Sequence, residues 1–417
     1  MVRSAGRTGL GEHQREVIPS IAGWSASAGK TRMVDMSASG HTIEALFTSI
    51  DQASDAHALF TAASTRLREI SPFDAAVWVA TDPLNGLTTA PVQVENLHEG
   101  GCGDYWESEL FAEHVHPFRD LARAPVPVAG LRAATGDRPA SSPLYRKFMS
   151  PRGFDDELRA VLRVDGQPWG HLSLFRERGR HPFRDADIAL VHAISVPMAR
   201  RLRSFALPVA GAFQDFAATP GMLLFDTAGS LVSINDEARH LLAEMPVGPA
   251  LPTAKGIDLP LPTWILTTAG HTRMTGENAR IRVRTRTGRW LVCHASSLRN
   301  GEDAAAVTAL VLEPARPTEV ASLIVAAYAL TDREMDVTEL IARGLSTAQI
   351  AARLFLSAHT VRDHVKAIFE KVGVTSRGEL VAKLFTDHYE PAAARNTLRI
   401  LSRDADGRTG YTGRRAE

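Results

Sequence analysis

The feature that most constrains this chain is a series of closely spaced helix starts between residues 331 and 388. Three of them have the S/T-x-x-E/Q pattern, in which a hydroxyl accepts from an N–H of the first turn and the acid or amide reaches back to the cap residue. The pairs are Thr331 with Glu334, Ser346 with Gln349, and Ser376 with Glu379. Ser357 marks a fourth start, and Gly373 can end the helix that follows it. The segment is therefore predicted to form four short helices.

The second and third predicted helices are separated only by Phe355, Leu356 and Ser357. This spacing is typical of a helix-turn-helix, in which the second of the two helices enters the major groove of DNA. The spacing therefore predicts DNA binding.

The third predicted helix has one apolar and one polar side. Val361, Val365 and Ile368 recur at helical spacing and form a stripe that can be buried. Arg362 and Lys366 lie one turn apart on the outward side, which suits contacts to guanine or to phosphate. An ordinary amphipathic helix with a solvated charged face would show the same cations, and the cations alone favour that interpretation. Together with the capping boxes and the short turn, however, the same cations favour a DNA-binding helix over a solvated amphipathic one.

The segment resembles the DNA-binding domain of LuxR-type transcriptional regulators, which FixJ-type response regulators share. The matching positions are Leu330-Thr331-Asp332-Arg333-Glu334, Gly344, Ser346, Ile350, Ala351, Ser357, Thr360, Val361, His364, Val365, Ile368, Lys371, Gly373, Val374, Ser376, Arg377, Glu379 and Leu380. Gln349 departs from the glutamate that is common in the family, but an amide serves the capping box equally well.

The resemblance implies a DNA-contacting surface and a pairing surface. The resemblance implies that Arg362, Asp363 and Lys366 lie at the base-reading face. With the neighbouring polar residues of the same helix, the predicted DNA contacts are Ser357, His359, Thr360, Arg362, Asp363, Lys366 and Lys371. Among them, Asp363 would repel phosphate and could instead accept from a cytosine amino group. The implied pairing surface, for two copies on a roughly two-fold site, is Leu380, Val381, Leu384 and Phe385. His364 is assigned to packing or phosphate support and not to a metal.

The net charge of the chain gives no general attraction to DNA. There are 47 basic and 47 acidic residues, so any positive surface must be local. The tail over 391–417 is rich in arginine and is expected to be disordered. It either touches DNA non-specifically or has no role.

The first 40 residues have no sustained periodicity and are expected to be disordered. They lack an apolar core of signal-peptide length, and no apolar run in the chain is long enough to span a membrane, so a soluble, cytoplasmic protein is expected. Cys102 and Cys293 form no CxxC motif and no disulfide framework. The segment from Gly23 to Thr31 looks like a phosphate-binding loop, but five residues separate Gly23 from Gly29 where four are needed.

Residues 42–206 are predicted to form a first unit of mixed helix and strand. Its expected elements are a helix over 43–67, strands over 75–80 and 87–94, a hairpin with a four-residue connection starting at Asp165-Gly166, and a helix from 182 to 203. This order resembles a GAF domain, above all in the run from Gly166 to Leu174 and in the residues at 180–185.

Residues 212–315 are predicted to form a second unit. It begins with a hairpin about residues 226–230 and a helix over 236–244, and it ends with strands over 279–285, 290–296 and 304–312. Helices in the Pro-rich middle, residues 251–262, cannot be placed from the pattern. The order resembles a PAS domain. The fold class is therefore multidomain α+β, with GAF-like and PAS-like α/β sensor units followed by an all-α four-helix helix-turn-helix domain over 317–390.

Neither unit carries a cofactor or catalytic motif. His114, His116, His171 and His181 cluster only loosely, with Cys102 near them in sequence, so a haem or metal centre is not favoured. A small-molecule ligand of unspecified identity is left open in either unit. No nucleophile elbow, kinase or zinc-protease pattern occurs, and the chain is expected not to be an enzyme.

Two functions remain. The favoured one is a sequence-specific transcriptional regulator that binds double-stranded DNA as a homodimer, contacts the transcription machinery and is modulated by its sensor units. The alternative is a ligand- or protein-binding signalling hub whose DNA binding is weak and non-specific.

Overall fold

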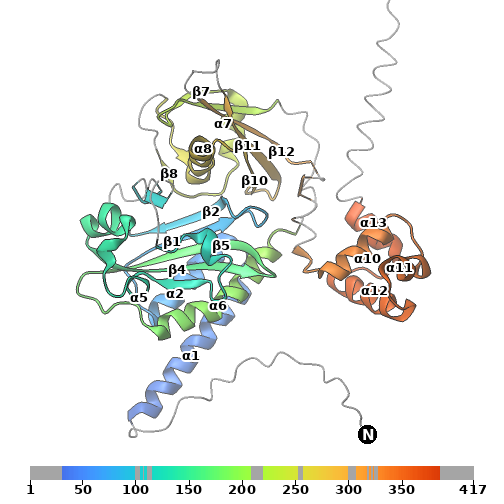
Figure 1. The fold of residues 1–417 in the computed structure, drawn as a ribbon, viewed down its shortest axis with the longest axis horizontal. Helices are drawn as coiled ribbons and strands as arrows, with labels where there is room; N and C mark the ends of the chain where they lie inside the picture. Colours follow the sequence, from blue (N-terminus) through green and yellow to red (C-terminus); the bar gives the residue numbers. More distant parts are fainter. Residues whose placement is uncertain are drawn as a thin grey trace, which may run out of the picture.

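The computed structural model describes residues 31–98, 104–106, 108–109, 115–207, 219–251, 257–298, 307–316, 319–320, 323 and 327–385. These ranges form two sheet-containing units and a helical unit (Figure 1). The expectations for residues 1–30, for Cys102 and His114, and for the tail over 391–417 lie outside the described residues.

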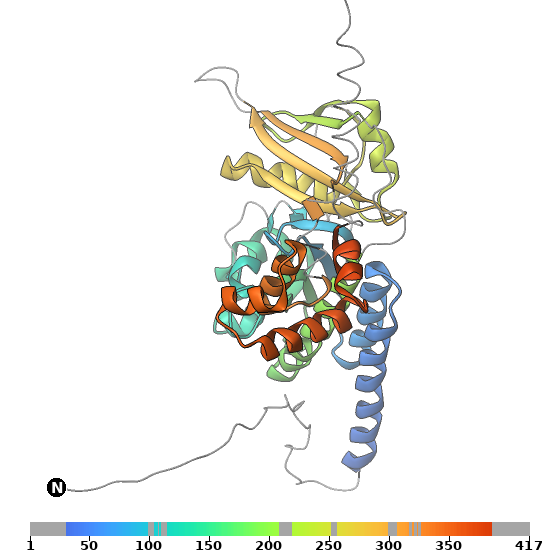
Figure 2. The same ribbon diagram turned by 90° about the vertical axis from the view of Figure 1, so that its right-hand side faces the viewer.

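The first unit begins with two helices, α1 (Thr31–Gln52) and α2 (Ala56–Ile70). The prediction of one helix over 43–67 was wrong, because Asp55 starts a new helix by accepting from the N–H of Ala58 at 2.8 Å. α1 also begins ten residues before the end of the stretch, 1–40, that was expected to be disordered. In both ribbon views the start of α1 projects away from the sheet (Figure 2).

The first sheet is antiparallel, with strand order β2-β1-β5-β4-β3. Its strands are β1 (Ala75–Thr81), β2 (Thr88–Glu95), β3 (Val128–Gly130), β4 (Phe154–Val164) and β5 (Gln167–Glu177). β1 is buried along its whole length because both faces of the sheet are covered. Trp78 faces one core with α2 and α6 (Asp185–Ser204), while Val77 faces a second core with Phe148.

Short helical segments border the second of these cores. They are α4 (Phe118–Leu121), α5 (Leu131–Ala134), η1 (Pro139–Ser141), η2 (Tyr145–Met149) and η3 (Ser150–Arg152). The hairpin between β4 and β5 is confirmed, but its connection is only Asp165 and Gly166 and not four residues. Both residues have positive φ, 50° and 75°, as a two-residue hairpin turn requires.

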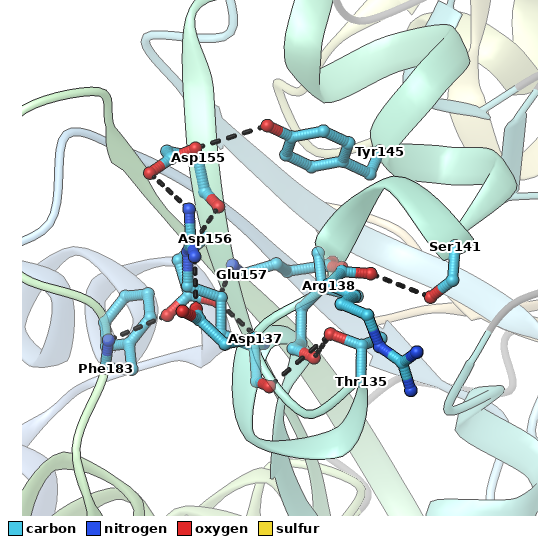
Figure 3. Close-up of polar contacts among 11 residues, drawn as sticks. Thr135, Asp137, Arg138, Ser141, Tyr145, Asp155, Asp156, Glu157 and Phe183 are labelled. Carbon is cyan, nitrogen blue, oxygen red and sulfur yellow. Dashed lines mark hydrogen bonds and ion pairs between the residues drawn. The ribbon is translucent and has the colours of Figure 1, made fainter.

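A group of acidic side chains at the start of β4 joins three segments of the first unit (Figure 3). Asp156 is buried and accepts from the backbone N–H of Arg132 at 3.2 Å and of Phe183 at 2.7 Å. Its neighbour Asp155 accepts from the hydroxyl of Tyr145 at 3.2 Å. These bonds fix β4 relative to α5, η2 and the segment that leads into α6.

The second unit is a five-stranded antiparallel sheet with strand order β10-β11-β12-β6-β7. Its elements are β6 (Gly221–Phe225), β7 (Leu231–Ile234), α7 (Asp236–Ala243), β8 (Ala250–Leu251), β9 (Leu261–Pro262), α8 (Thr263–Thr275), β10 (Ala279–Arg284), β11 (Trp290–Leu298) and β12 (Val307–Pro314). The predicted opening hairpin, the helix after it and the three closing strands are confirmed. α8 was not predicted, because it is buried on most sides and so lacks an amphipathic stripe.

A buried ion pair joins the two sheet-containing units. Both carboxylate oxygens of Asp82 accept from one terminal nitrogen of Arg282, at 2.7 and 2.9 Å, and the exposed fractions of the two residues are 1% and 7%. Thr89 donates to the carbonyl of Arg282 at 2.7 Å. The Nε of Arg282 donates to the carbonyl of Glu319 at 2.7 Å. One guanidinium thus contacts both units and the start of the segment that leads to the helical unit.

The helical unit contains α10 (Asp332–Ala342), α11 (Thr347–Leu354), α12 (Ala358–Val372) and α13 (Arg377–Phe385). α12 packs against both α10 and α11 around a core that includes Val337, Ile350, Val361 and Ile368. None of the helices in the described ranges has the length and apolar character that are needed to cross a bilayer.

Candidate nucleic-acid interface

Two of the three predicted capping boxes are complete. The Thr331 hydroxyl accepts from the N–H of Glu334 at 3.2 Å, and the Glu334 carboxylate accepts from the N–H of Thr331 at 2.7 Å. In the second box, the Ser346 hydroxyl accepts from the N–H of Gln349 at 3.4 Å, and the Gln349 amide oxygen accepts from the N–H of Ser346 at 2.8 Å. The third box, at the start of α13, is only half formed. The Ser376 hydroxyl accepts from the N–H of Glu379 at 3.1 Å, but the Glu379 carboxylate accepts from Thr375 instead of from Ser376.

The turn between α11 and α12 consists of the three predicted residues. Ser357 caps α12 by accepting from the N–H of Thr360 at 3.0 Å. Phe355 has a left-handed backbone with φ 57°, and its side chain is 95% exposed. The residues on either side of it, Leu354 and Leu356, pack against the core of the helical unit. The helices are therefore joined at a fixed angle although the turn carries an unfavourable residue for its conformation.

The predicted apolar side of α12 is confirmed. Val361 and Ile368 are fully buried, Val365 is half-buried, and Val372 closes the stripe at the end of the helix. The opposite side is consequently presented to solvent along the whole helix.

The exposed side of α12 carries both signs of charge. Its residues at helical spacing are His359, Arg362, Asp363, Lys366 and Glu370. The Nδ1 of His359 lies 3.4 Å from a carboxylate oxygen of Asp363, and the Nε of Arg362 donates to the carbonyl of Ala358 at 3.1 Å. Lys366 has no hydrogen-bond or ion-pair partner among the described residues. Glu370 was not singled out from the sequence, although its spacing from Lys366 places it on the same side.

The first turn of α12 holds two hydroxyl groups. The oxygens of Ser357 and Thr360 lie 2.9 Å apart, and Ser357 is exposed while Thr360 is half-buried. They stand at the positive end of the helix dipole, next to N–H groups that lack intrahelical partners. An anionic oxygen such as that of a phosphate is the group that such a helix end favours.

Lys371 lies apart from this exposed surface. Its Nζ donates to Glu334 at 2.6 Å and to the carbonyl of Ala329 at 3.0 Å. Burial would raise the pKa of Glu334, but the bonds from Lys371 and from the Thr331 N–H outweigh burial and lower it. The sequence placed Lys371 among the DNA contacts; in the structure it joins α12 to the start of α10.

The predicted pairing surface on α13 also differs from expectation. Leu380 is 1% exposed and belongs to the core of its own unit, so it is not available to a second copy. Val381 is half-buried against the same core. The side chains of Leu384 and Phe385 lie outside the described residues.

Within the first unit, a buried polar cluster was missed because its members alternate with apolar residues in β4 and β5. Arg159 is bonded to Glu109 and lies 3.6 Å from Glu157, which accepts from Ser173 at 2.8 Å. Burial raises the pKa of Glu157 to about 7, against the lowering effect of Arg159. In this cluster a serine hydroxyl therefore donates to a carboxylate of raised pKa, and both side chains are buried.

The histidines that were weighed as metal ligands do not come together in the described residues. His171 is buried and stacks on Phe118 with 3.9 Å between ring centroids, and burial lowers its pKa to about 3. A different group, His294, Glu313 and Glu319, places three donor atoms within 4.8 Å of one another. Both Glu319 oxygens already accept hydrogen bonds, from Arg280 and from the N–H of Arg316.

Comparison with known proteins places the helical unit in a family. The model of the bacterial regulatory proteins of the luxR family matches residues 328–384. The spore germination protein GerE of Bacillus subtilis is 42% identical over 55 residues, which are 13% of this chain and 74% of GerE. A nitrate/nitrite response regulator protein homolog of Haemophilus influenzae is 54% identical over 48 residues, 12% of this chain and 23% of its own length. The chain therefore spans about a quarter of that regulator.

Two solved structures show weaker likenesses. The VqmA dimer of Vibrio cholerae, described as a LuxR-type receptor, aligns over 42% of this chain and 84% of its own, with 16% identity and a TM-score of 0.20. The GAF domain of a phosphoenolpyruvate-protein phosphotransferase from Acinetobacter aligns over 40% and 92%, with 12% identity and a TM-score of 0.25. It is the match of residues 328–384, together with the coverage of GerE, that decides the assignment: this chain belongs to the luxR family of bacterial regulatory proteins.

Proposed function

We propose that this protein is a transcriptional regulator that binds double-stranded DNA sequence-specifically as a homodimer in the cytoplasm. The observation that carries the proposal is the exposed side of α12, which stands opposite the buried stripe and follows a three-residue turn. In a helix-turn-helix, this side of the second helix enters the major groove.

The side chains of α12 have different roles in this proposal. Arg362 and Lys366 donate to guanine acceptors, and Asp363 accepts from cytosine. Ser357, His359 and Thr360 contact phosphate near the start of the helix. Lys371 is left out of the contact set because its Nζ is bonded to Glu334. For pairing two copies, we propose Val381, Leu384 and Phe385, without the buried Leu380.

The remaining chain supplies regulation. We propose that residues 42–206 form a GAF-like unit, residues 212–315 a PAS-like unit and residues 317–390 the DNA-binding domain. The antiparallel five-stranded sheet in each of the first two units, with helices packed on it, supports this division. A signal received in these units alters the spacing of two DNA-binding domains, which then contact the transcription machinery differently.

A random-sequence DNA selection with purified protein, followed by affinity measurements on the selected site, tests the proposal. Arg362→Ala and Lys366→Ala should each weaken binding by about 1–3 kcal/mol, or roughly 5- to 150-fold. Arg333→Ala is the matched control, because Arg333 is an exposed cation on α10 that pairs with Asp336. Selection of no common sequence, or unchanged affinity in both α12 variants, would refute base reading by α12.

The alternative function is a ligand- or protein-binding signalling hub with weak DNA binding. It is favoured by the two carboxylates, Asp363 and Glu370, on the exposed side of α12 and by the balanced charge of the chain. In that case the affinity would fall steeply with salt and would be the same for all DNA sequences. Measuring the affinity for selected and scrambled DNA at several salt concentrations separates the two functions.

A further inference from the structure

A cavity of about 600 Å³ lies between the two sheet-containing units. The first unit contributes Trp169 and Phe205 to its wall, and the second contributes Arg284 and Trp290. Leu323, from the segment that leads to the helical unit, completes the wall. Its volume is in the range of cavities that enclose small molecules, which occur preferentially between domains.

The charged groups of the wall do not neutralise one another. Asp82 and Arg282 form a closed pair, so they leave little net charge. Arg284 donates to the carbonyls of Phe205 and Gly288 and has no carboxylate partner among the described residues. Burial lowers the pKa of Arg284, as expected for a guanidinium that has no carboxylate partner in the described ranges.

A second guanidinium stands at the same wall. Arg286 is exposed and donates to the carbonyl of Ala243 at 2.9 Å, again with no carboxylate partner in the described part of the chain. The wall also contains Asp55, which accepts from the N–H of Ala58 as the cap of α2, so three arginines stand against two carboxylates. The cavity therefore has an excess of positive charge on the side formed by the turn between β10 and β11.

The rest of the wall is apolar. Trp169 and Trp290 are almost fully buried, and Leu202, Phe205 and Leu323 lie with them. A guest that matches both parts needs a hydrophobic body and one acidic group, because burying a charge without a partner is costly.

We propose that this cavity binds an amphipathic organic monoanion, with an aromatic or aliphatic body against Trp169 and Trp290 and a carboxylate, sulfonate or phosphate group at Arg284 and Arg286. The binding itself is independent of DNA recognition, whereas a regulatory role for it rests on the proposed function. A guest here contacts both units and Leu323 together, so it favours the arrangement in which all three meet.

The test uses 1-anilinonaphthalene-8-sulfonate and its uncharged analogue N-phenyl-1-naphthylamine as probes of the full-length protein. Trp169 and Trp290 lie in the wall, so energy transfer from tryptophan to a dye bound here should be strong. The chain has six tryptophans, so the variants below are what assign the binding to this cavity. The sulfonate should bind at least about tenfold more tightly than the neutral dye, and Arg284→Met should remove most of this difference. Arg239→Met, which alters an exposed arginine outside the cavity, is the control.

A pair of variants at the cavity mouth keeps the test decisive if Arg284→Met does not fold. Val247 lines the cavity and is 83% exposed, so its replacement leaves the core intact. Val247→Glu should weaken sulfonate binding by about two- to fivefold and Val247→Lys should strengthen it by a similar factor, with the neutral dye unaffected. Equal responses of the two dyes, or equal sulfonate affinity in the two Val247 variants, would overturn the proposal.

The same variants separate this inference from the proposed function. In the absence of dye, each should bind the selected DNA as the parent protein does, because none of them lies on α12. Charge-selective dye binding in a protein that selects no DNA sequence would contradict the regulator and leave the cavity proposal standing. DNA selection without charge-selective dye binding would have the opposite meaning.

Discussion

The ion pair between Asp82 and Arg282 allows a sharp prediction about how the two sheet-containing units are held together. In Asp82→Leu, the buried guanidinium loses two side-chain bonds and its only carboxylate partner within the described residues. Arginine does not lose its proton, so the charge remains buried without a direct ion pair, and only the attraction of Glu319 offsets it. We expect the free energy of unfolding to fall by about 3–5 kcal/mol.

The opposite single variant should cost less. In Arg282→Met, Asp82 keeps the N–H bonds from Leu84 and residue 282, and it can also take up a proton. Burial raises the pKa of Asp82 against the attraction of Arg282, and burial lowers the pKa of Arg282, so both charges are less favourable here than in water. Replacing both residues by Leu and Met should therefore be less destabilising than Asp82→Leu alone.

Urea unfolding followed by tryptophan fluorescence measures these differences. The control is Glu69→Gln, which breaks the exposed ion pair with Arg66 and should cost less than about 1 kcal/mol. If Asp82→Leu were as mild as Glu69→Gln, or if the double variant lost the sum of the two single losses, the reasoning about an uncompensated buried charge would be refuted.

Three further predictions concern single side chains. Lys371→Met should lower the stability of the protein by about 1–3 kcal/mol in thermal unfolding, because it leaves the buried Glu334 carboxylate without its cation, whereas binding to non-specific DNA should change little. The pKa of His171 is about 3 in the folded protein and about 6.5 in the unfolded chain, so between these pH values only the unfolded chain binds the proton. The free energy of unfolding therefore decreases as the pH falls from 6.5 toward 3. His171→Leu should reduce that decrease in unfolding curves measured at about pH 7 and pH 4. Burial raises the pKa of Cys293 far above its usual range, so in a Cys102→Ser background a thiol reagent should modify Cys293 only after denaturation, and rapid labelling of the native protein would contradict this.

The parts of the fold that were predicted well depend on local chemistry. The starts of α10, α11 and α12 are set by hydroxyl groups within three residues of the N–H groups that they cap, so the sequence states them directly. The hairpins at Asp165-Gly166 and about Asp226 follow from the same kind of short-range preference.

The parts that were missed depend on partners far away in the chain. Asp82 and Arg282 are separated by 200 residues, and neither has a neighbour that marks it as buried. The cavity is formed only where the two sheet-containing units meet, so no local sequence motif predicts it. Lys371 matched a DNA-binding pattern, but in the structure its Nζ donates to Glu334 and to the carbonyl of Ala329. Charge and spacing identify a cation, whereas only packing shows which way it turns.

The turn at Phe355 has a consequence for how the recognition helix can be used. A left-handed backbone is unfavourable for phenylalanine by about 1 kcal/mol or more, and its exposed ring gains no burial in return. The angle between α11 and α12 is therefore imposed by the packing of Leu354 and Leu356 and not by the turn itself. A synthetic peptide covering residues 346–373 would relax out of this angle, and a graft of α12 onto another scaffold would have to include α10 and α11 as well.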